Sequence, residues 1–123
     1  MIKEEKRWLI VLIHVGILCL IGILGCVWLP IFKEKQEEVV KINPTEEQIL
    51  FFYKEDCKDC QRIFPVIYWH SFFKKDVVYV NLSVKENQLY IQKYHLQEVP
   101  TLCRGQTVVS GTDVQAIRKF LYP

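Results

Sequence analysis

Cysteine is the residue type in this 123-residue chain best suited to chemistry, and the chain has five of them. Cys57 and Cys60 form a Cys-Lys-Asp-Cys motif, while the other three stand apart at positions 19, 26 and 103. Two cysteines with two residues between them can exchange a disulfide with a partner, hold a static disulfide, or contribute thiolates to a metal site. The secondary structure expected around the motif indicates which of these three chemistries is favoured.

The motif follows a continuous apolar run at 49–53 and opens a helical pattern over 58–75. A strand-length run without polar alternation is typical of a central strand that is buried on both faces. Cys57 then lies at the N-terminus of a helix, where unpaired backbone N–H groups and the helix dipole stabilise a thiolate. We expect Cys57 to be the nucleophile. Cys60, one turn further on and more buried, would resolve the mixed disulfide.

A metal site is the first alternative to disulfide exchange. Structural zinc usually takes four ligands, often from a second cysteine pair or from paired histidines. The remaining candidates after position 44 are His70, His95 and Cys103, and none has the spacing of a second pair. We therefore expect no metal ligands and no cofactor, with a metal module and a purely structural disulfide as the weaker interpretations.

The rest of the C-terminal part continues an alternation of strands and helices. Val99-Pro100 precedes the last two strands, and Thr112 or Asp113 is placed to cap the last helix. The expected elements are a strand at 77–82, a helix at 85–95, strands at 101–103 and 107–109 joined through 104–106, and a helix at 113–121. This order predicts an α/β fold.

The N-terminal part is a different kind of sequence. From Trp8 to Phe32 the chain runs 25 residues without Asp, Glu, Lys or Arg. About 20 apolar residues span the hydrocarbon core as a helix, and the tryptophans at positions 8 and 28 suit the two interfaces. We expect a short tail at 1–7 and a transmembrane anchor at 8–32. A cleaved signal peptide and a lipoprotein signal with Cys26 as the lipidated residue are the alternatives.

The remaining segments complete the expected organisation. A charged stretch at 33–44 reads as a linker, and a domain follows at 45–123, beginning with a helical turn at 45–47. Basic residues balance on the two sides of the anchor. The short N-terminal segment favours a single-pass protein of the cell membrane whose C-terminal domain lies outside the cytoplasm. With 16 Lys and Arg against 14 Asp and Glu and no basic stripe, the composition argues against nucleic acid binding.

The C-terminal domain resembles the thioredoxin superfamily, over about 48–121. The resemblance rests on the strand that leads into Cys57 and Cys60, on Pro65 within the following helix, on Val99-Pro100-Thr101, and on the glycines of the closing hairpin and last helix entry. It implies a thioredoxin-like fold with a reduced N-terminal part. It also implies that Pro100 is cis, that its loop keeps metal off the cysteines, and that the backbone of Val99 receives an extended substrate peptide.

Three departures from the family pattern separate this chain from a general cytoplasmic reductase. Asp56 stands where thioredoxins usually have tryptophan, and Phe51 stands where they have a buried aspartate. The dipeptide between the cysteines is Lys-Asp instead of Gly-Pro. We expect Cys103 to pack in the core, with a third redox cysteine as the alternative.

The combination of anchor and domain is similar to thioredoxin-like accessory proteins of Gram-positive bacteria, some of them encoded beside bacteriocin or conjugation genes. We therefore expect a membrane-tethered thiol–disulfide oxidoreductase that acts on thiols or disulfides of exported proteins and is recycled by a redox partner. The alternative is a non-catalytic thioredoxin-like module that binds an export or conjugation complex and carries a structural disulfide.

Overall fold

The structure, a computed structural model, describes residues 1–43 and 47–123. Pro44, the last residue of the expected linker, and most of the helical turn expected at 45–47 lie outside the described residues. The chain divides into two compact units, Met1–Phe32 and Lys33–Pro123. Each unit is described by itself.

The first unit is the body of one helix, α1 (Ile2–Glu34), which begins within the expected tail and continues past Pro30. Its 33 residues extend about 50 Å at 1.5 Å per residue. By length and composition α1 is able to cross a membrane, a test that a signal sequence near an N-terminus also passes. Its apolar side chains are exposed because the unit holds no other element for them to pack against.

The second unit is built on a four-stranded sheet in the order β2-β1-β3-β4. β1 (Ile49–Tyr53) pairs in parallel with β2 (Val77–Asn81) and antiparallel with β3 (Thr101–Arg104), which forms a hairpin with β4 (Thr107–Ser110). All five residues of β1 are buried, as the apolar run predicted for a central strand. β2 is less buried than expected, because it lies at the sheet edge and has a single neighbouring strand.

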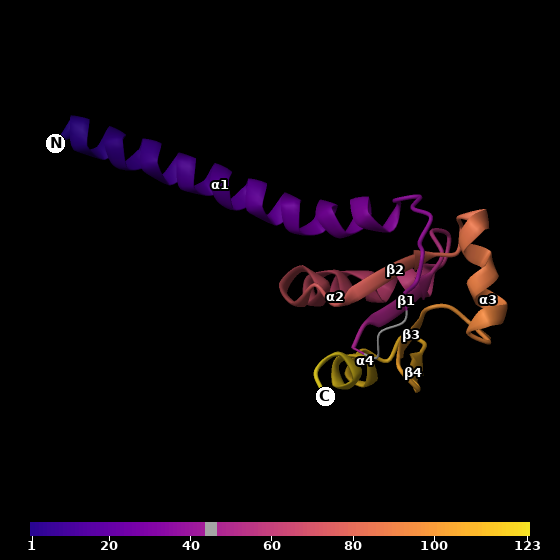
Figure 1. Ribbon diagram of the computed structural model, residues 1–123. Coiled ribbons are helices and arrows are strands. Elements are labelled where there is room, and N and C mark those ends of the chain that lie inside the picture. Colours follow the sequence, from indigo (N-terminus) through magenta and orange to yellow (C-terminus); the bar gives the residue numbers. More distant parts are fainter. Residues whose placement is uncertain (44–46) are drawn as a thin grey trace. The chain divides into compact units, whose positions relative to one another are not determined.

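α2 connects β1 to β2, α3 lies between β2 and β3, and α4 follows β4 (Figure 1). α2 (Lys58–Lys74) and α4 (Val114–Leu121) agree with their predicted positions, and Asp113 caps α4. The predicted helix at 85–95 is instead a 3₁₀ turn, Lys85–Gln88, followed by a short α3 (Leu89–Lys93). The buried Asn87 side chain bonds to backbone groups outside this helix, and such bonds compete with a regular helical start. The arrangement is the predicted α/β fold.

The sheet has two differently covered faces. On the first face, α2 and α4 pack against Ile49, Phe51 and Tyr53 of β1. On the second face, α3 and the segment that contains Val40 and Ile42 pack against the alternate residues of β1. Both faces of β1 are therefore covered, which explains why its sequence lacks polar alternation.

Part of the segment expected to be a linker is held against the second face. The Val40 N–H donates to Oδ1 of Asn87 at 2.9 Å, and the Tyr90 hydroxyl donates to the Val40 carbonyl at 2.7 Å. The Ile42 N–H also donates to the Tyr90 hydroxyl oxygen, and the Ile42 side chain is buried. Side-chain amides and hydroxyls here satisfy backbone groups that would otherwise bind water, so this part of the segment is ordered.

Candidate active site

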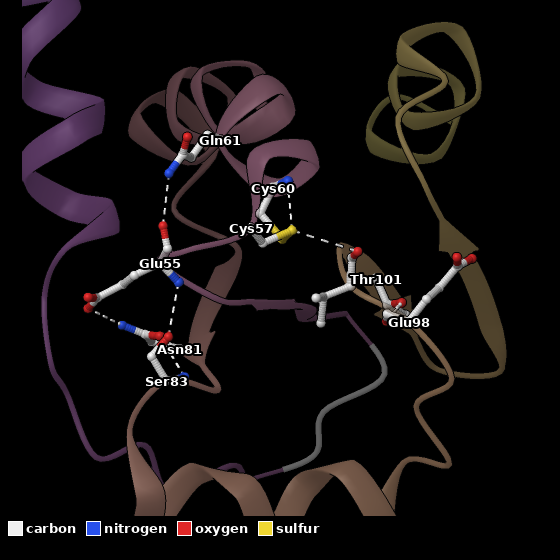
Figure 2. Close-up of a disulfide and its surroundings, with 9 residues drawn as sticks. Glu55, Cys57, Cys60, Gln61, Asn81, Ser83, Glu98 and Thr101 are labelled. Atoms are coloured by element: carbon white, nitrogen blue, oxygen red, sulfur yellow. Dashed lines mark hydrogen bonds between the residues drawn. A yellow bond between two sulfur atoms is a disulfide. The ribbon is translucent and has the colours of Figure 1, made fainter.

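Cys57 occupies the N-cap position of α2, as the sequence predicted. Its backbone is extended, with φ −89° and ψ 110°, and its sulfur accepts a hydrogen bond from the Cys60 backbone N–H at 3.1 Å. The two cysteines are joined in a disulfide with a Cα–Cα distance of 5.2 Å (Figure 2). Cys57 is half-buried, whereas Cys60 is fully buried against the first face of the sheet. The exposed sulfur is therefore the one at the helix terminus, where a thiolate is best stabilised.

The loop before Cys57 is fixed by three side chains. The Glu55 N–H donates to the Ser83 hydroxyl at 3.0 Å, and the Gln61 side chain donates to the Glu55 carbonyl at 2.9 Å (Figure 2). The Asn81 amide donates to the Glu55 carboxylate at 2.8 Å. Sequence reasoning missed this support, because residues that are up to 28 positions apart meet only in the fold. Its effect is to hold the start of α2 in one position.

The loop that contains Pro100 lies beside the disulfide. The Val99–Pro100 peptide bond is cis, which confirms the expectation from the family resemblance. The Val99 carbonyl oxygen is 3.9 Å from the Cys57 sulfur. The Thr101 hydroxyl donates to the Glu98 carbonyl at 2.7 Å, and the Gly111 N–H donates to the Pro100 carbonyl at 3.1 Å. The fold therefore brings together Cys57 and Cys60 with Val99 and the adjacent Pro100.

The interior next to the pair is apolar and aromatic. Phe51 is fully buried, and its ring packs against Tyr53, Phe64 and Tyr79 at centroid distances of 5.1, 5.6 and 6.0 Å. Burial raises the pKa of Tyr79 to about 12 and also raises the pKa of Tyr53, so both phenols stay neutral at physiological pH. No hydrogen bond joins a carboxylate to either sulfur within residues 1–43 and 47–123.

Among the remaining cysteines, Cys103 lies away from the pair. Cys103 is buried on the second face of the sheet, whereas Cys60 packs on the first face. Burial raises the pKa of the Cys103 thiol. This position favours a packing role for Cys103 over a third redox cysteine. Cys19 and Cys26 are on α1. Over the described part of the chain, no three His, Cys, Asp or Glu side chains are grouped so that they could hold a metal ion.

Comparison with known proteins gives matches at the level of structure. No family model and no curated protein sequence matches the chain. Thioredoxin f2 of Chlamydomonas reinhardtii superposes with a TM-score of 0.51 at 21% identity, over 72% of this chain and 81% of that protein. The thioredoxin Mala s 13 of Malassezia sympodialis gives a TM-score of 0.49 at 20% identity, over 61% of this chain and 75% of that protein.

The likeness to thioredoxin f2 shows that the second unit has a thioredoxin-like fold. Identities near 20% carry no information on substrates or partners. The chemistry therefore has to be argued from the site itself. The site holds a cysteine pair at disulfide distance, with one half-buried sulfur at a helix N-terminus, and such a pair is able to undergo thiol–disulfide exchange.

Proposed function

We propose that this chain is a membrane-anchored thiol–disulfide oxidoreductase that acts on exported proteins. The observation that carries the proposal is the disulfide between the N-cap residue of α2, Cys57, and the buried Cys60, beside cis-Pro100. Helix N-termini favour a thiolate, and a second cysteine one turn away can complete the exchange. A disulfide that only held the fold together would not require a half-exposed sulfur at this position.

In the reducing direction the Cys57 thiolate attacks one sulfur of a client disulfide. A Cys57–client disulfide forms, and the other client sulfur leaves as a thiolate. The Cys60 thiol then loses its proton and attacks the Cys57 sulfur, which releases the second client thiolate and forms the Cys57–Cys60 disulfide. In the oxidising direction a client thiolate attacks the Cys57 sulfur, and the same steps run in reverse. A redox partner restores the starting state of the pair.

The backbone at Val99 is the proposed client platform. An extended client segment that adds to this backbone as a strand would place its own sulfur next to the Cys57 sulfur, because the Val99 carbonyl lies 3.9 Å away. The pinning of this loop through Glu98 and Gly111 supports a preformed docking site. Main-chain recognition of this kind accepts many client sequences.

The membrane part of the proposal rests on α1. We propose that α1 is an uncleaved single-pass anchor of the cell membrane and that the C-terminal domain lies outside the cytoplasm. Exported proteins are the clients that such a domain would meet, in an environment where disulfides persist. The length and apolar character of α1 support this placement.

Trapping with a Cys60→Ser variant of the full chain tests the proposed mechanism. Without the resolving thiol, the mixed disulfide on Cys57 should accumulate and should be visible as a reducible band on a non-reducing gel. Cys57→Ser is the matched control and should trap nothing. If neither variant captures an exported protein under conditions where both are folded and membrane-bound, the oxidoreductase proposal is wrong.

One observation favours a second function. Phe51 occupies the strand position at which the resembled family carries a buried acid, and no carboxylate is hydrogen-bonded to the sulfurs in the part of the chain that the structure describes. A thioredoxin-like module that binds an export or conjugation complex would not need proton transfer at Cys60. A Cys57→Ser/Cys60→Ser double variant that retains the wild-type phenotype would support this alternative over the enzyme.

A further inference from the structure

The last turns of α2 carry an aromatic surface, which consists of the half-buried Tyr68 and Trp69 and the exposed Phe72 and Phe73. The rings contact one another in sequence, with centroid distances of 5.1 Å from Tyr68 to Trp69, 5.6 Å from Trp69 to Phe72 and 5.3 Å from Phe72 to Phe73. Phe72 is 54% exposed and Phe73 is 76% exposed. Contiguous apolar patches of this kind mark interaction sites. The disulfide chemistry at the other end of α2 does not use this surface.

Basic side chains border the aromatic surface. Lys74 and Lys75 follow it directly and are exposed. A groove of about 580 Å³ extends the surface from Trp69 and Phe73 to the exposed Arg118 and Tyr122 of the C-terminal segment. The acidic residue nearest in sequence, Asp76, is engaged by the buried His70, whose Nε2 is 3.0 Å from its carboxylate. The surface is therefore aromatic and cationic.

Aromatic rings flanked by lysines match the chemistry of a membrane interface. Tryptophan and tyrosine partition into the headgroup region, and lysines are attracted to anionic lipids. A second protein could also cover aromatic rings. The bilayer is favoured here because of how the domain is connected to α1.

The connection between α1 and the domain is short and held against the domain. α1 ends at Glu34, and the Gln36 carbonyl already accepts a hydrogen bond from the Asn81 amide at 3.2 Å. Asn81 ends β2, and Val77 at the other end of this strand is three residues after the end of α2. Four strand residues span only about 13 Å. The tether therefore keeps the whole domain, the aromatic surface included, within reach of the membrane that α1 is proposed to cross, which gives this contact a high effective concentration.

We propose that the aromatic surface, together with Lys74 and Lys75, inserts into the headgroup region of the membrane that anchors the chain, with a preference for anionic lipids. This inference rests on the membrane placement of α1 in the proposed function and not on its redox chemistry. The domain would then contact the bilayer through this surface in addition to its covalent connection to α1. Cys57 lies at the opposite end of α2 from these rings, about 17 Å along the helix from Tyr68 and about 24 Å from Phe73.

Fluorescence quenching in the full chain tests this contact. Trp8→Phe and Trp28→Phe leave Trp69 as the sole tryptophan. The protein is reconstituted into vesicles of phosphatidylcholine and phosphatidylglycerol that carry a nitroxide on the lipid headgroup in both leaflets. The control adds Trp69→Phe and Val108→Trp, which moves the tryptophan to an exposed position on β4, at the opposite edge of the sheet from β2. We expect stronger quenching of Trp69 than of the tryptophan at position 108.

Variants of the aromatic surface and its lysines test the contribution of each to the membrane contact. Each lysine near an anionic membrane favours contact roughly fivefold, so Lys74→Gln/Lys75→Gln should lower the ratio of docked to undocked domain about 30-fold. Phe72→Ser/Phe73→Ser should reduce Trp69 quenching to the control value. These four residues are exposed, so the substitutions should leave the core intact.

The quenching experiment separates the two levels of the proposal. Flotation of the protein with the vesicles reports the anchor by itself. If the protein floats but Trp69 is quenched no more than the control, the membrane-facing surface is wrong and the anchor stands. If the protein does not float, both the anchor and the surface are wrong, while trapping on Cys57 still reports the redox chemistry.

Discussion

The two faces of the sheet hold the same residue type in two different chemical settings. On the first face, the buried Cys60 is disulfide-bonded to Cys57 at the N-terminus of a 17-residue helix. On the second face, Cys103 is buried below the five-residue α3 and the segment that leads from α1. Both Cys60 and Cys103 are withdrawn from solvent, so burial does not distinguish them.

The difference lies in what each cysteine can reach. Cys60 is disulfide-bonded to the half-buried Cys57 one helical turn away, and this bond is the one that the proposed exchange would use. Cys103 is bounded by apolar side chains, and burial raises its pKa. The first face holds the cysteine pair. The second face holds the backbone of Val40 through hydrogen bonds to Asn87 and Tyr90.

The largest expected effect is on the first face. Cys57→Ser should abolish thiol–disulfide exchange, because a serine oxygen cannot form or receive a disulfide. The measurement is the reduction of insulin disulfides by the detergent-solubilised full chain with dithiothreitol as the electron source. Cys103→Ser is the matched control and should retain the wild-type rate. Equal rates in the two variants would remove the distinction between the faces.

A smaller effect is expected where the second face holds the chain. Asn87 is fully buried and joins the Val40 N–H to the carbonyls of Glu38 and Asn81. Asn87→Ala should lower the free energy of unfolding by about 3 kcal/mol, at about 1 kcal/mol for each of three lost hydrogen bonds, of which the one to the Asn81 carbonyl is buried. Urea unfolding measures this loss, and Gln92→Ala on the exposed side of α3 is the control. A loss no larger than that of the control would mean that residues 36–42 do not depend on Asn87.

The sequence predicted the first face far better than the second. An apolar run, a cysteine motif at a helix start and Val99-Pro100 are local signals, and the structure agrees with each. The position of β2 at the sheet edge and the packing of residues 36–42 depend on contacts between residues as many as 50 positions apart. Such contacts leave no local pattern. Asn87 shows the difference. No local pattern marks this residue in the sequence, yet its side-chain amide makes three hydrogen bonds in the fold.

The cap of α4 tests a local feature of the first face. Oδ1 of Asp113 accepts hydrogen bonds from the N–H groups of Gln115 and Ala116 at 3.0 and 3.2 Å. Asp113→Ala should cost about 1 kcal/mol of stability, as is usual for a lost N-cap. Asp113→Asn, which keeps the capping oxygen, should cost less in the same urea measurement. If the two variants lose equal stability, the cap contributes nothing and another role of the carboxylate must explain the loss.

The smallest expected effect is on the thiol of Cys103, and it depends on pH. Burial raises its pKa, so the folded chain should keep Cys103 protonated near pH 8.5, where an ordinary thiol is half ionised. Its contribution to stability is therefore complete below that pH and is lost as the pH rises through the higher folded pKa. In a Cys19→Ala/Cys26→Ala variant with the Cys57–Cys60 disulfide formed, iodoacetamide should modify Cys103 slowly at pH 8.5 and rapidly after urea unfolding. Rapid modification of the folded chain would mean that the second face opens to solvent, and the contrast between the two faces would then rest on the helix terminus at Cys57 alone.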